Sequence, residues 1–431
     1  MASTRLYRTF GAGNRDKWTF SAWLKWDGFG GDTKVFSSYV DGSNYGHIEF
    51  TGYKLSYNGT PSAGTLTTNR VFRDPTAWYN IQVIYDSGNA TSGDRIQMWV
   101  NGVRETSFST ETYPSQDQDG VINSAQVHAI GARGDASQYW GGEMSHVHFA
   151  DGQAYPASTF GEIDATSGIW VAKTSPTVTY GTNGFFLKFA SGASGTDSSG
   201  ETNDFTVSGN LTNTKDNPDN NFATLNPLDT SIGTAPTITD CNTTTTTGDS
   251  WVGSTIPIQS GKWYWEVKVP SAGIECVTGV LLANNLNYSG TNWIGLSVAG
   301  VYGFAGISGN KITSGTATSY DSAISQNDIM MFAMDAAAGS LYVGVNGTWL
   351  QSSNPATSTS PMISSMGTDS MWIPFTTTSG TCINNFNFGN GYFGTTSHGE
   401  TNADDAGIGL FKYDVPASYY TLCTDNLGDQ S

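Results

Sequence analysis

The feature that most constrains the fold is an aromatic strand followed by a late Val-Asn-Gly turn, a combination that occurs once in each half of the chain. In the first half, every second side chain from Trp18 to Leu24 is apolar, as a strand with one buried face requires. A later strand runs into Asn101-Gly102, which favours a two-residue hairpin because both turn positions need φ > 0. In the second half, residues 262–269 and Asn346-Gly347 repeat the combination. The pattern predicts two copies of one antiparallel architecture.

Composition supports an all-β chain and excludes several other classes. Of 431 residues, 13% are charged, 13% are aromatic and 52 are Gly. Disordered chains lack such aromatic content, and the periodic Ala/Glu/Lys/Leu/Arg-rich stretches of long helices are missing. The formal net charge is −18, from 19 basic and 37 acidic residues, whereas nucleic-acid binding needs clustered Lys and Arg. We therefore expect an all-β protein that binds no nucleic acid.

The chain divides into two predicted domains. Residues 212–238 contain few apolar residues and the pairs Asn217-Pro218 and Asn226-Pro227, which is typical of a linker or a crossing segment. We therefore predict one antiparallel β-sandwich at residues 1–211 and a second at residues 239–431. Further strands are expected at residues 4–10, 78–85, 95–100, 126–130, 143–149, 184–189, 328–334 and 341–345.

Two features bear on the compartment in which the protein folds. No window approaches the roughly 18 consecutive apolar residues of a membrane helix. Residues 1–7 lack the apolar core of a signal peptide, so we expect the chain to be made and folded in a cytoplasm. Buried free thiols are the default expectation in a reducing compartment. The cysteines stand far apart, at Cys241, Cys276, Cys382 and Cys423.

The first half carries a family resemblance. The segments that carry it are residues 79–85, 95–102, 139–153, 161–164, 168–171, 180–185, 197–200, 203–205 and 221–227. They resemble the laminin-G/concanavalin A-like lectin domain, and more narrowly a version found in virion proteins of tailed bacteriophages, chiefly marine ones. The resemblance implies a jelly-roll sandwich that binds glycans or protein surfaces. The opening strand departs from the family pattern, because it is reduced to about residues 4–10.

The second half resembles a SPRY domain. The segments that carry this resemblance are residues 261–267, 293–296, 328–335, 339–343, 346–347 and 385–389, and the closing segments 411–416 and 422–427 again look like a phage version. The resemblance implies a second concanavalin A-like jelly roll, so the expected fold is two tandem antiparallel β-sandwich domains. It also implies another binding module. We predict a non-enzymatic virion protein, namely a tail fibre, capsid fibre or decoration protein, that displays lectin-like domains for adhesion to host-surface glycans.

This role implies partners and a location. The expected partners are other virion proteins of the capsid or tail and a host-surface glycan, and the expected location is the virion, assembled in the host cytoplasm without membrane insertion. A homo-oligomer is expected, with a trimer taken from appendage proteins generally, although no heptad run supports a coiled-coil stalk. Two alternatives stay open. One is an architectural cement protein that binds only virion proteins, and the other is a polysaccharide depolymerase.

Two sets of side chains are candidates for binding. Aromatic rings in turn-rich segments stack on the C–H faces of sugars, and these glycan candidates are Tyr45, Tyr139, Trp140, Tyr288 and Trp293. Core packing is the alternative for Trp293. Loop carboxylates suit calcium, which laminin-G modules often hold, and these candidates are Asp86, Asp94, Asp117 and Asp119. Acidic loops are common on a chain of this charge, so calcium is an option and no cofactor is required.

Two motifs resemble reactive sites but are incomplete. Glu162-Ile163-Asp164 begins the Glu-x-Asp-x-(x)-Glu motif of laminarinase-type hydrolases, which share the concanavalin A-like fold, yet no second Glu follows. Retaining hydrolysis needs two carboxyl groups about 5 Å apart, so we predict a turn there and no enzymatic activity. His146 and His148 would share one face of a strand, but two ligands do not make a metal site. We expect a satisfied surface pair.

Overall fold

The computed structural model describes residues 4–27, 31–190, 192, 194–229, 235–246, 248–271, 276–287, 298–380 and 382–428. It divides into two compact units. The N-terminal unit comprises Met1–Asn213 and Asn217–Asp219, and the C-terminal unit comprises Thr214–Asp216 and Asn220–Ser431. The division therefore falls inside the segment 212–238, and most of that segment belongs to the C-terminal unit.

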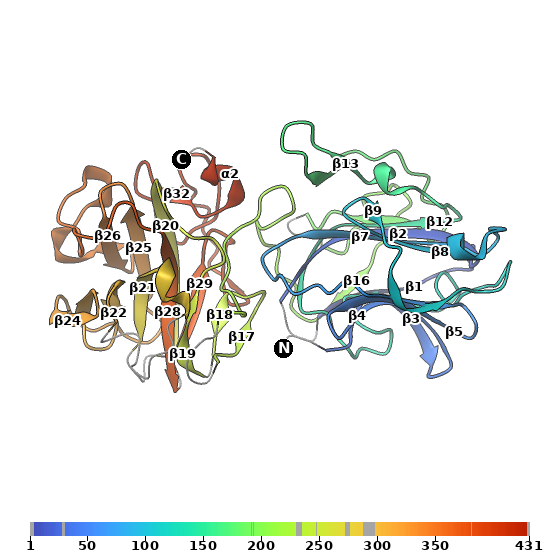
Figure 1. The fold of residues 1–431 in the computed structure, drawn as a ribbon, viewed down its shortest axis with the longest axis horizontal. Helices are drawn as coiled ribbons and strands as arrows, with labels where there is room; N and C mark the ends of the chain where they lie inside the picture. Colours follow the sequence, from blue (N-terminus) through green and yellow to red (C-terminus); the bar gives the residue numbers. More distant parts are fainter. Residues whose placement is uncertain are drawn as a thin grey trace. The chain divides into compact units, whose positions relative to one another are not determined.

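Two antiparallel sheets build the N-terminal unit (Figure 1). The first, called the β3 sheet, has the spatial order β10 (Phe108–Thr112), β6 (Thr65–Thr68), β5 (Lys54–Thr60), β4 (Asn44–Thr51), β3 (Thr33–Asp41), β11 (Val127–Ile130), β1 (Arg5–Thr9) and β16 (Thr206–Ser208). The second, called the β2 sheet, has the order β15 (Phe185–Leu187), β12 (Gly142–Asp151), β2 (Lys17–Trp26), β7 (Tyr79–Asp86), β8 (Ile96–Val100) and β9 (Val103–Arg104). A separate hairpin pairs β13 (Gly161–Ile163) with β14 (Trp170–Ala172).

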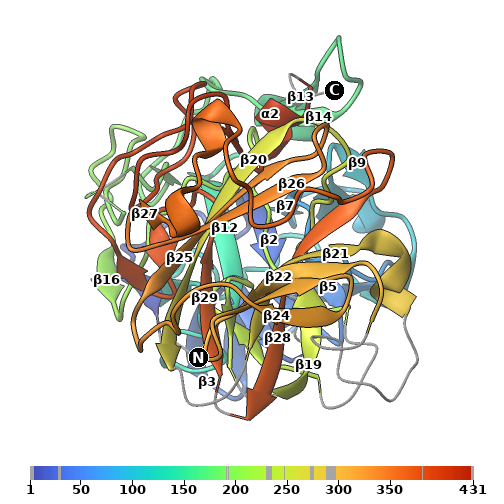
Figure 2. The ribbon, with the colours of Figure 1, turned by 90° about the vertical axis from the view of Figure 1, so that its left-hand side faces the viewer.

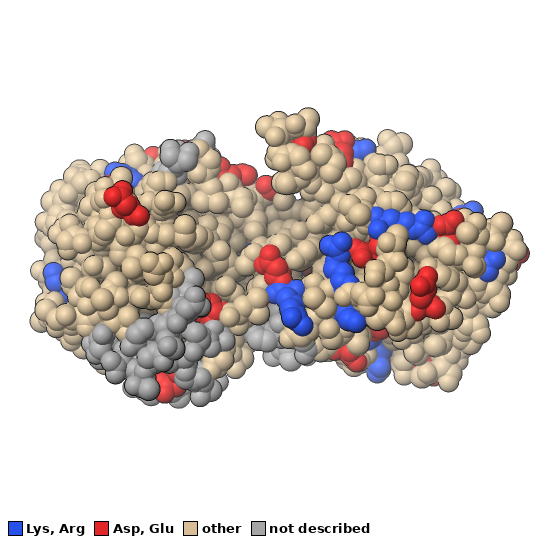
Figure 3. Space-filling model, viewed as in Figure 1, with Lys and Arg blue, Asp and Glu red and all other residues tan. Residues whose placement is uncertain are grey.

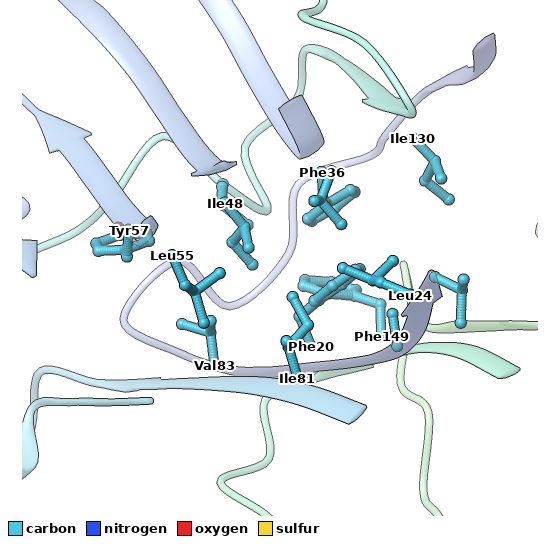
Figure 4. Close-up of a cluster of buried hydrophobic side chains, with 14 of the residues drawn as sticks. Phe20, Leu24, Phe36, Ile48, Leu55, Tyr57, Ile81, Val83, Ile130 and Phe149 are labelled. Carbon is cyan, nitrogen blue, oxygen red and sulfur yellow. The ribbon is translucent and has the colours of Figure 1, made fainter. Parts of the chain in front are cut away.

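The core of the N-terminal unit lies between these two sheets (Figure 4). The predicted inward face of β2 is confirmed, since every second side chain from Trp18 to Leu24 is buried in this core. Phe20 stacks on Phe36 of the facing sheet, with ring centroids 5.0 Å apart and planes 4° apart. Because each such buried side chain contributes about 1.5–3 kcal/mol, this alternation fixes which side of each strand faces inward.

The C-terminal unit is a second sandwich, and Figure 2 labels many of its strands. Its β20 sheet has the order β17 (Ile238–Thr239), β18 (Thr244–Thr245), β29 (Ile383–Asn387), β20 (Lys262–Ser271), β25 (Ile329–Asp335), β26 (Ser340–Val345) and β27 (Thr348–Trp349), and β32 (Tyr420–Thr421) pairs with β20 in parallel. Its β21 sheet has the order β19 (Gly248–Gly253), β28 (Trp372–Gly380), β21 (Val277–Leu282), β22 (Val301–Ala305), β23 (Asn310–Thr313) and β24 (Thr316–Ser319). A short hairpin pairs β30 (Tyr392–Phe393) with β31 (Thr396–Ser397). The prediction of two tandem antiparallel β-sandwiches is confirmed.

The two predicted hairpins are built in the same way. Asn101 and Asn346 both have positive φ, 47° and 50°, as their turn positions require. The Asn101 side-chain oxygen accepts a hydrogen bond from the backbone N–H of Asn80 at 2.8 Å, and Asn346 accepts one from Ile329 at 2.9 Å. Each asparagine thus ties its turn to the start of the neighbouring strand of the sheet, β7 or β25.

An ion pair at the start of each opening strand repeats as well. Lys17 lies opposite Asp86 in the register of β2 and β7, and Lys262 lies opposite Asp335 in the register of β20 and β25. The two pairs have N···O distances of 3.3 and 3.2 Å. In both units the opening strand, β2 or β20, pairs with β7 or β25 on one side and with the late strand, β12 or β29, on the other. The expectation of one architecture used twice is therefore confirmed.

The helical segments are short. They are η1 (Ser92–Asp94), η2 (Ala157–Thr159), η3 (Ala283–Asn287), η4 (Leu350–Ser352), η5 (Pro355–Thr357) and α2 (Thr424–Leu427). Within the described part of the chain, none of the helices has the length and apolarity needed to span a membrane.

Two cysteines pair, contrary to the expectation of free thiols. Cys276 and Cys382 form a disulfide across 106 residues of sequence, with their Cα atoms 6.6 Å apart. Cys276 directly precedes β21 and Cys382 directly precedes β29, so the bond joins the two sheets of the C-terminal unit. The prediction was wrong for this pair because the strand order, which the sequence spacing does not reveal, brings these two strand starts together.

The closing segment of the chain covers the outer face of the β20 sheet. Phe411 packs edge-on against Tyr264 of β20, with ring centroids 4.9 Å apart. The neighbouring Glu266 is fully buried, and its carboxylate accepts hydrogen bonds from the backbone N–H groups of Lys412 and Tyr413 at 2.9 and 2.8 Å. It also accepts bonds from the Tyr264 hydroxyl and the Asn387 amide. Burial raises the pKa of Glu266 to about 7, and the convergent donors hold the closing segment in place.

Replacement of Glu266 should therefore destabilise the C-terminal unit. Glu266→Gln sets an NH₂ group against backbone donors that then lack an acceptor, at an expected cost of about 2–4 kcal/mol in the free energy of unfolding. The matched control is Glu400→Gln, which breaks an exposed ion pair with Lys412 and should cost less than about 1 kcal/mol. Hydrogen–deuterium exchange of the β20 peptide in the full chain measures both effects. An equal loss of unfolding free energy in the two variants would refute the role of Glu266 in holding the closing segment.

Candidate functional site

The candidate site lies on the outer face of the β3 sheet. Alternation along β3 and β4 directs Phe36 and Ile48 into the core and the side chains of Tyr39, Tyr45 and His47 to the opposite face. Tyr39 and Tyr45 lie directly opposite each other in the register of the two strands, and both are partly exposed. We call Tyr39, Tyr45 and His47 the aromatic row.

The rings of the aromatic row lie nearly parallel. Tyr45 and His47 have centroids 4.4 Å apart and planes 13° apart, and Tyr39 lies 6.5 Å from Tyr45 at 25°. His47 is buried. The Tyr45 and His47 rings are therefore stacked face to face, and the accessible part of the aromatic row consists of the partly exposed side chains of Tyr39 and Tyr45.

The loop of residues 131–140 borders the aromatic row. The Arg133 guanidinium lies over the ring of Tyr39, 4.4 Å from its centroid, and pairs bidentately with Asp135 at 2.9 and 2.6 Å. Hydrogen bonds from Arg133 lower the pKa of Asp135 to about 2. Gly134 allows this close approach, because a Cβ there would lie 3.2 Å from the backbone nitrogen of Tyr39.

A buried ion pair adjoins the other end of the aromatic row. Lys34 of β3 pairs with Glu49 of β4, and both side chains are largely inaccessible to solvent. The His47 ring nitrogen Nδ1 lies 3.8 Å from a Glu49 carboxylate oxygen. Burial, with the nearby charges of Lys34 and Arg133, lowers the pKa of His47 to about 3, so the imidazole is neutral at physiological pH.

The structure places the glycan candidates differently from one another. Tyr45 belongs to the aromatic row, and Tyr139 is a partly exposed residue of the bordering loop. Trp140 instead packs against the edge of the core, with its ring 5.5 Å from Phe50. Tyr288 and Trp293 lie outside the described residues.

The sequence analysis missed Tyr39, His47 and Arg133. The run from Tyr45 to Phe50 alternates polar or aromatic side chains with apolar ones, which is a strand pattern. A turn with Asp41 at its start precedes this run and is closed by the Ser43 backbone N–H at 2.7 Å. This turn followed by an alternating segment was the sequence feature from which an aromatic strand face could have been predicted.

The four calcium candidates do not converge on one point. Three of them are held by basic side chains. These pairs are Asp86 with Lys17, Asp94 with Arg104 and Asp119 with Arg15. The fourth candidate, Asp117, lies near Asp86, and both carboxylates are next to Gly88. The described residues contain no group of three or more His, Cys, Asp or Glu side chains that could hold a metal ion.

The hydrolase-like motif lies at the end of a strand, and the turn follows it: Glu162 and Ile163 belong to β13, and residues 165–167 form the turn. Glu162 lies on the exposed strand β13, 3.8 Å from Lys173. The Asp164 carboxylate accepts hydrogen bonds from the backbone N–H groups of Thr166 and Ser167 at 3.1 and 2.6 Å. These bonds lower the pKa of Asp164. Both carboxyl groups are therefore engaged in the hairpin between β13 and β14.

The two histidines of β12 differ from the expected surface pair. A bulge between Ser145 and His148 interrupts the alternation, and His146 has a φ of 47°. His148 is buried, stacks on Phe186 with centroids 3.9 Å apart, and hydrogen-bonds the Tyr180 hydroxyl at 2.9 Å. The expectation of a surface pair was wrong because residues 155–180 cover this face of the strand.

Comparisons with known proteins agree with the fold of the N-terminal unit. The model of the concanavalin A-like lectin/glucanases superfamily matches residues 7–157, a range that includes the aromatic row and its bordering loop. The N-terminal unit therefore contains a concanavalin A-like lectin domain. A search of curated proteins found no match.

Solved structures with a similar backbone include the SPRY domain of human HERC1 and the PSpry domain of TRIM65. Each is 14% identical to this chain over 38% of its length, with a TM-score of 0.30. The alignments cover 96% and 89% of those two chains.

The neutral state of His47 predicts acid sensitivity of the N-terminal unit. Its folded pKa of about 3 lies below the usual value of 6.5, so the unfolded chain binds more protons below pH 6.5. The free energy of unfolding should then fall by up to about 1.4 kcal/mol per pH unit on acidification. His47→Gln should remove this contribution, about 2 kcal/mol between pH 6.5 and 5. Hydrogen–deuterium exchange of the β4 peptide at several pH values measures it, and parallel pH profiles would contradict the assignment.

Proposed function

We propose that the chain is a non-enzymatic adhesion protein of a tailed-phage virion that binds host-surface glycans through the outer face of the β3 sheet. The aromatic row supports the adhesion, because its two tyrosines are partly exposed on a domain that matches the lectin/glucanase superfamily. The virion setting is supported by the sequence resemblance of residues 139–153 and the later segments to virion domains. In this role the chain is a tail fibre, a capsid fibre or a decoration protein.

The proposed contact is shallow. Tyr39 and Tyr45 are partly exposed and offer ring surface, while Asn58 of the adjacent strand lies directly opposite His47 and provides a polar edge. A shallow site of this kind binds one sugar weakly. Display in many copies on a particle turns such contacts into avidity, which is why we propose a homo-oligomer, with a trimer as the form taken from phage appendages.

The C-terminal unit is assigned a different part of the function. Alternation along β19, β21 and β28 directs Trp251, Leu281 and Phe375 to the outer face of the β21 sheet, and all three are buried. That apolar, covered face differs from the partly exposed aromatic row of the N-terminal unit. We assign glycan contact to the N-terminal unit, and we assign contact with other virion proteins to the C-terminal unit because its resemblance to SPRY domains implies a binding module.

Truncation of the aromatic row should abolish glycan binding. Tyr45→Ala and Tyr39→Ala each remove a stacking ring, and each should weaken binding at least about tenfold, or 1.4 kcal/mol. Trp99→Ala is the matched control, because Trp99 is a comparably exposed aromatic residue on β8 of the other sheet. Glycan-array retention of the full chain, with calcium and with a chelator, measures the effect.

The same array separates the competing functions. Retention that Tyr45→Ala abolishes and Trp99→Ala preserves supports adhesion. If the full chain retains no glycan with calcium or with the chelator, the adhesion proposal is refuted and an architectural cement protein is favoured. Release of reducing sugars from a retained polysaccharide would overturn the non-enzymatic assignment.

A further inference from the structure

We infer that the aromatic row selects uncharged glycans and discriminates against acidic ones, because the two cations at its ends, Arg133 and Lys34, are each already paired with a carboxylate. The inference rests on the proposed function and names the ligand class of the same site. It is carried by two ion pairs at the two ends of the aromatic row and by the charge of the whole unit.

The first ion pair occupies the arginine that would otherwise bind an anion. Arg133 is the guanidinium that lies on the aromatic row, stacked over Tyr39. Its Nε and Nη2 atoms donate to the two carboxylate oxygens of Asp135. This is the bidentate geometry in which arginine binds a carboxylate or a sulfate, so Asp135 fills the position that an acidic sugar would need.

The second ion pair occupies the lysine at the other end. Lys34 is buried against Glu49, and a buried charge loses several kcal/mol if its partner is removed. A ligand carboxylate therefore cannot draw Lys34 away from Glu49 without that cost. His47 between the two pairs is neutral, since burial and the adjacent cations lower the pKa of His47 to about 3.

One further cation lies behind the bordering loop. Arg5 of β1 donates from Nη1 to the carbonyl oxygen of Gly134 at 2.7 Å, and its guanidinium lies 4.6 Å from the ring centroid of Tyr7. It therefore supports the loop from the β1 side. Burial raises the pKa of Glu49, and the nearby Asp32 carboxylate contributes to the same shift. Asp32 therefore adds an anion at the opposite end of the aromatic row.

The charge of the whole unit acts in the same direction. The residues of the N-terminal unit include 14 basic and 21 acidic side chains. On the face in Figure 3, the basic side chains of the N-terminal unit stand among acidic ones, and neither gathers into a patch. A net negative field lowers the local concentration of polyanions, whereas an uncharged hexose meets no such penalty and still gains the ring contact.

The decisive experiment compares wild type with Asp135→Asn on an array of matched neutral and acidic polysaccharides, including dextran and carboxymethyl-dextran. Wild type should retain neutral glycans at least about tenfold more strongly than their carboxymethylated forms. Asp135→Asn leaves Arg133 stacked on Tyr39 without its anion, so retention of acidic glycans should rise at least about fivefold, while retention of neutral glycans stays within about twofold.

The matched control is Asp119→Asn, which makes the same charge change by releasing Arg15 from an exposed ion pair elsewhere. It should leave both ratios unchanged, and thermal melting checks that each variant is folded. Wild-type retention of acidic glycans that Tyr45→Ala abolishes would overturn the inference but keep the proposed adhesion. An equal gain for both asparagine variants would show that net charge, and not Arg133, sets the selectivity. Retention of no glycan at all would remove the proposed function and the inference with it.

Discussion

The rest of each unit depends on one constraint, the burial of the inner face of the opening strand between two sheets. β2 and β20 each lie inside their sheet. β2 lies between β7 and β12, and β20 lies between β25 and β29. Their alternate side chains, from Trp18 and from Trp263 onward, are buried in the core. Because side chains alternate between the two faces of a strand, a shift of one residue would move all of these side chains from the core to the outer face of the sheet at once. The same register therefore recurs in both units, together with the Lys–Asp pair and the Val-Asn-Gly turn.

The outer faces of the sheets decide where function can lie. The outer face of the β2 sheet is covered by the chain that follows β12, for example where Trp170 packs against Trp23 and Trp78. The outer face of the β20 sheet is covered by the closing segment, which Glu266 holds in place by accepting two backbone hydrogen bonds. The β3 sheet differs, because its outer face carries partly exposed tyrosines beside paired charges. Among these outer faces, the β3 sheet therefore offers partly exposed aromatic side chains, although His47 beside them is buried.

Strong period-2 segments and Asn-Gly turns could be predicted from the sequence, since local alternation and local turn chemistry specify them. The strands that hold the candidate site were harder to predict. β4 to β6 are rich in Thr, Ser, Asn and Gly, which reads as loop composition unless the facing strands are known. Tyr45 was singled out as an aromatic residue in a turn-rich segment, but Tyr39 and Arg133 were not. Their roles arise from pairing across β3 and β4 and from the close approach of Gly134.

By itself, the sequence determined the all-β class, the duplicated architecture and the inner faces of the opening strands, because these follow from side-chain periodicity within single segments. Only the tertiary structure decided which residues far apart in sequence meet. It joined Cys276 to Cys382, brought Arg133 onto Tyr39 and buried His148 under a covering segment. The physical reason is that periodicity fixes the face of a strand but not its neighbours. Strand order, which depends on how both sheets bury their apolar faces together, sets every contact of the candidate site.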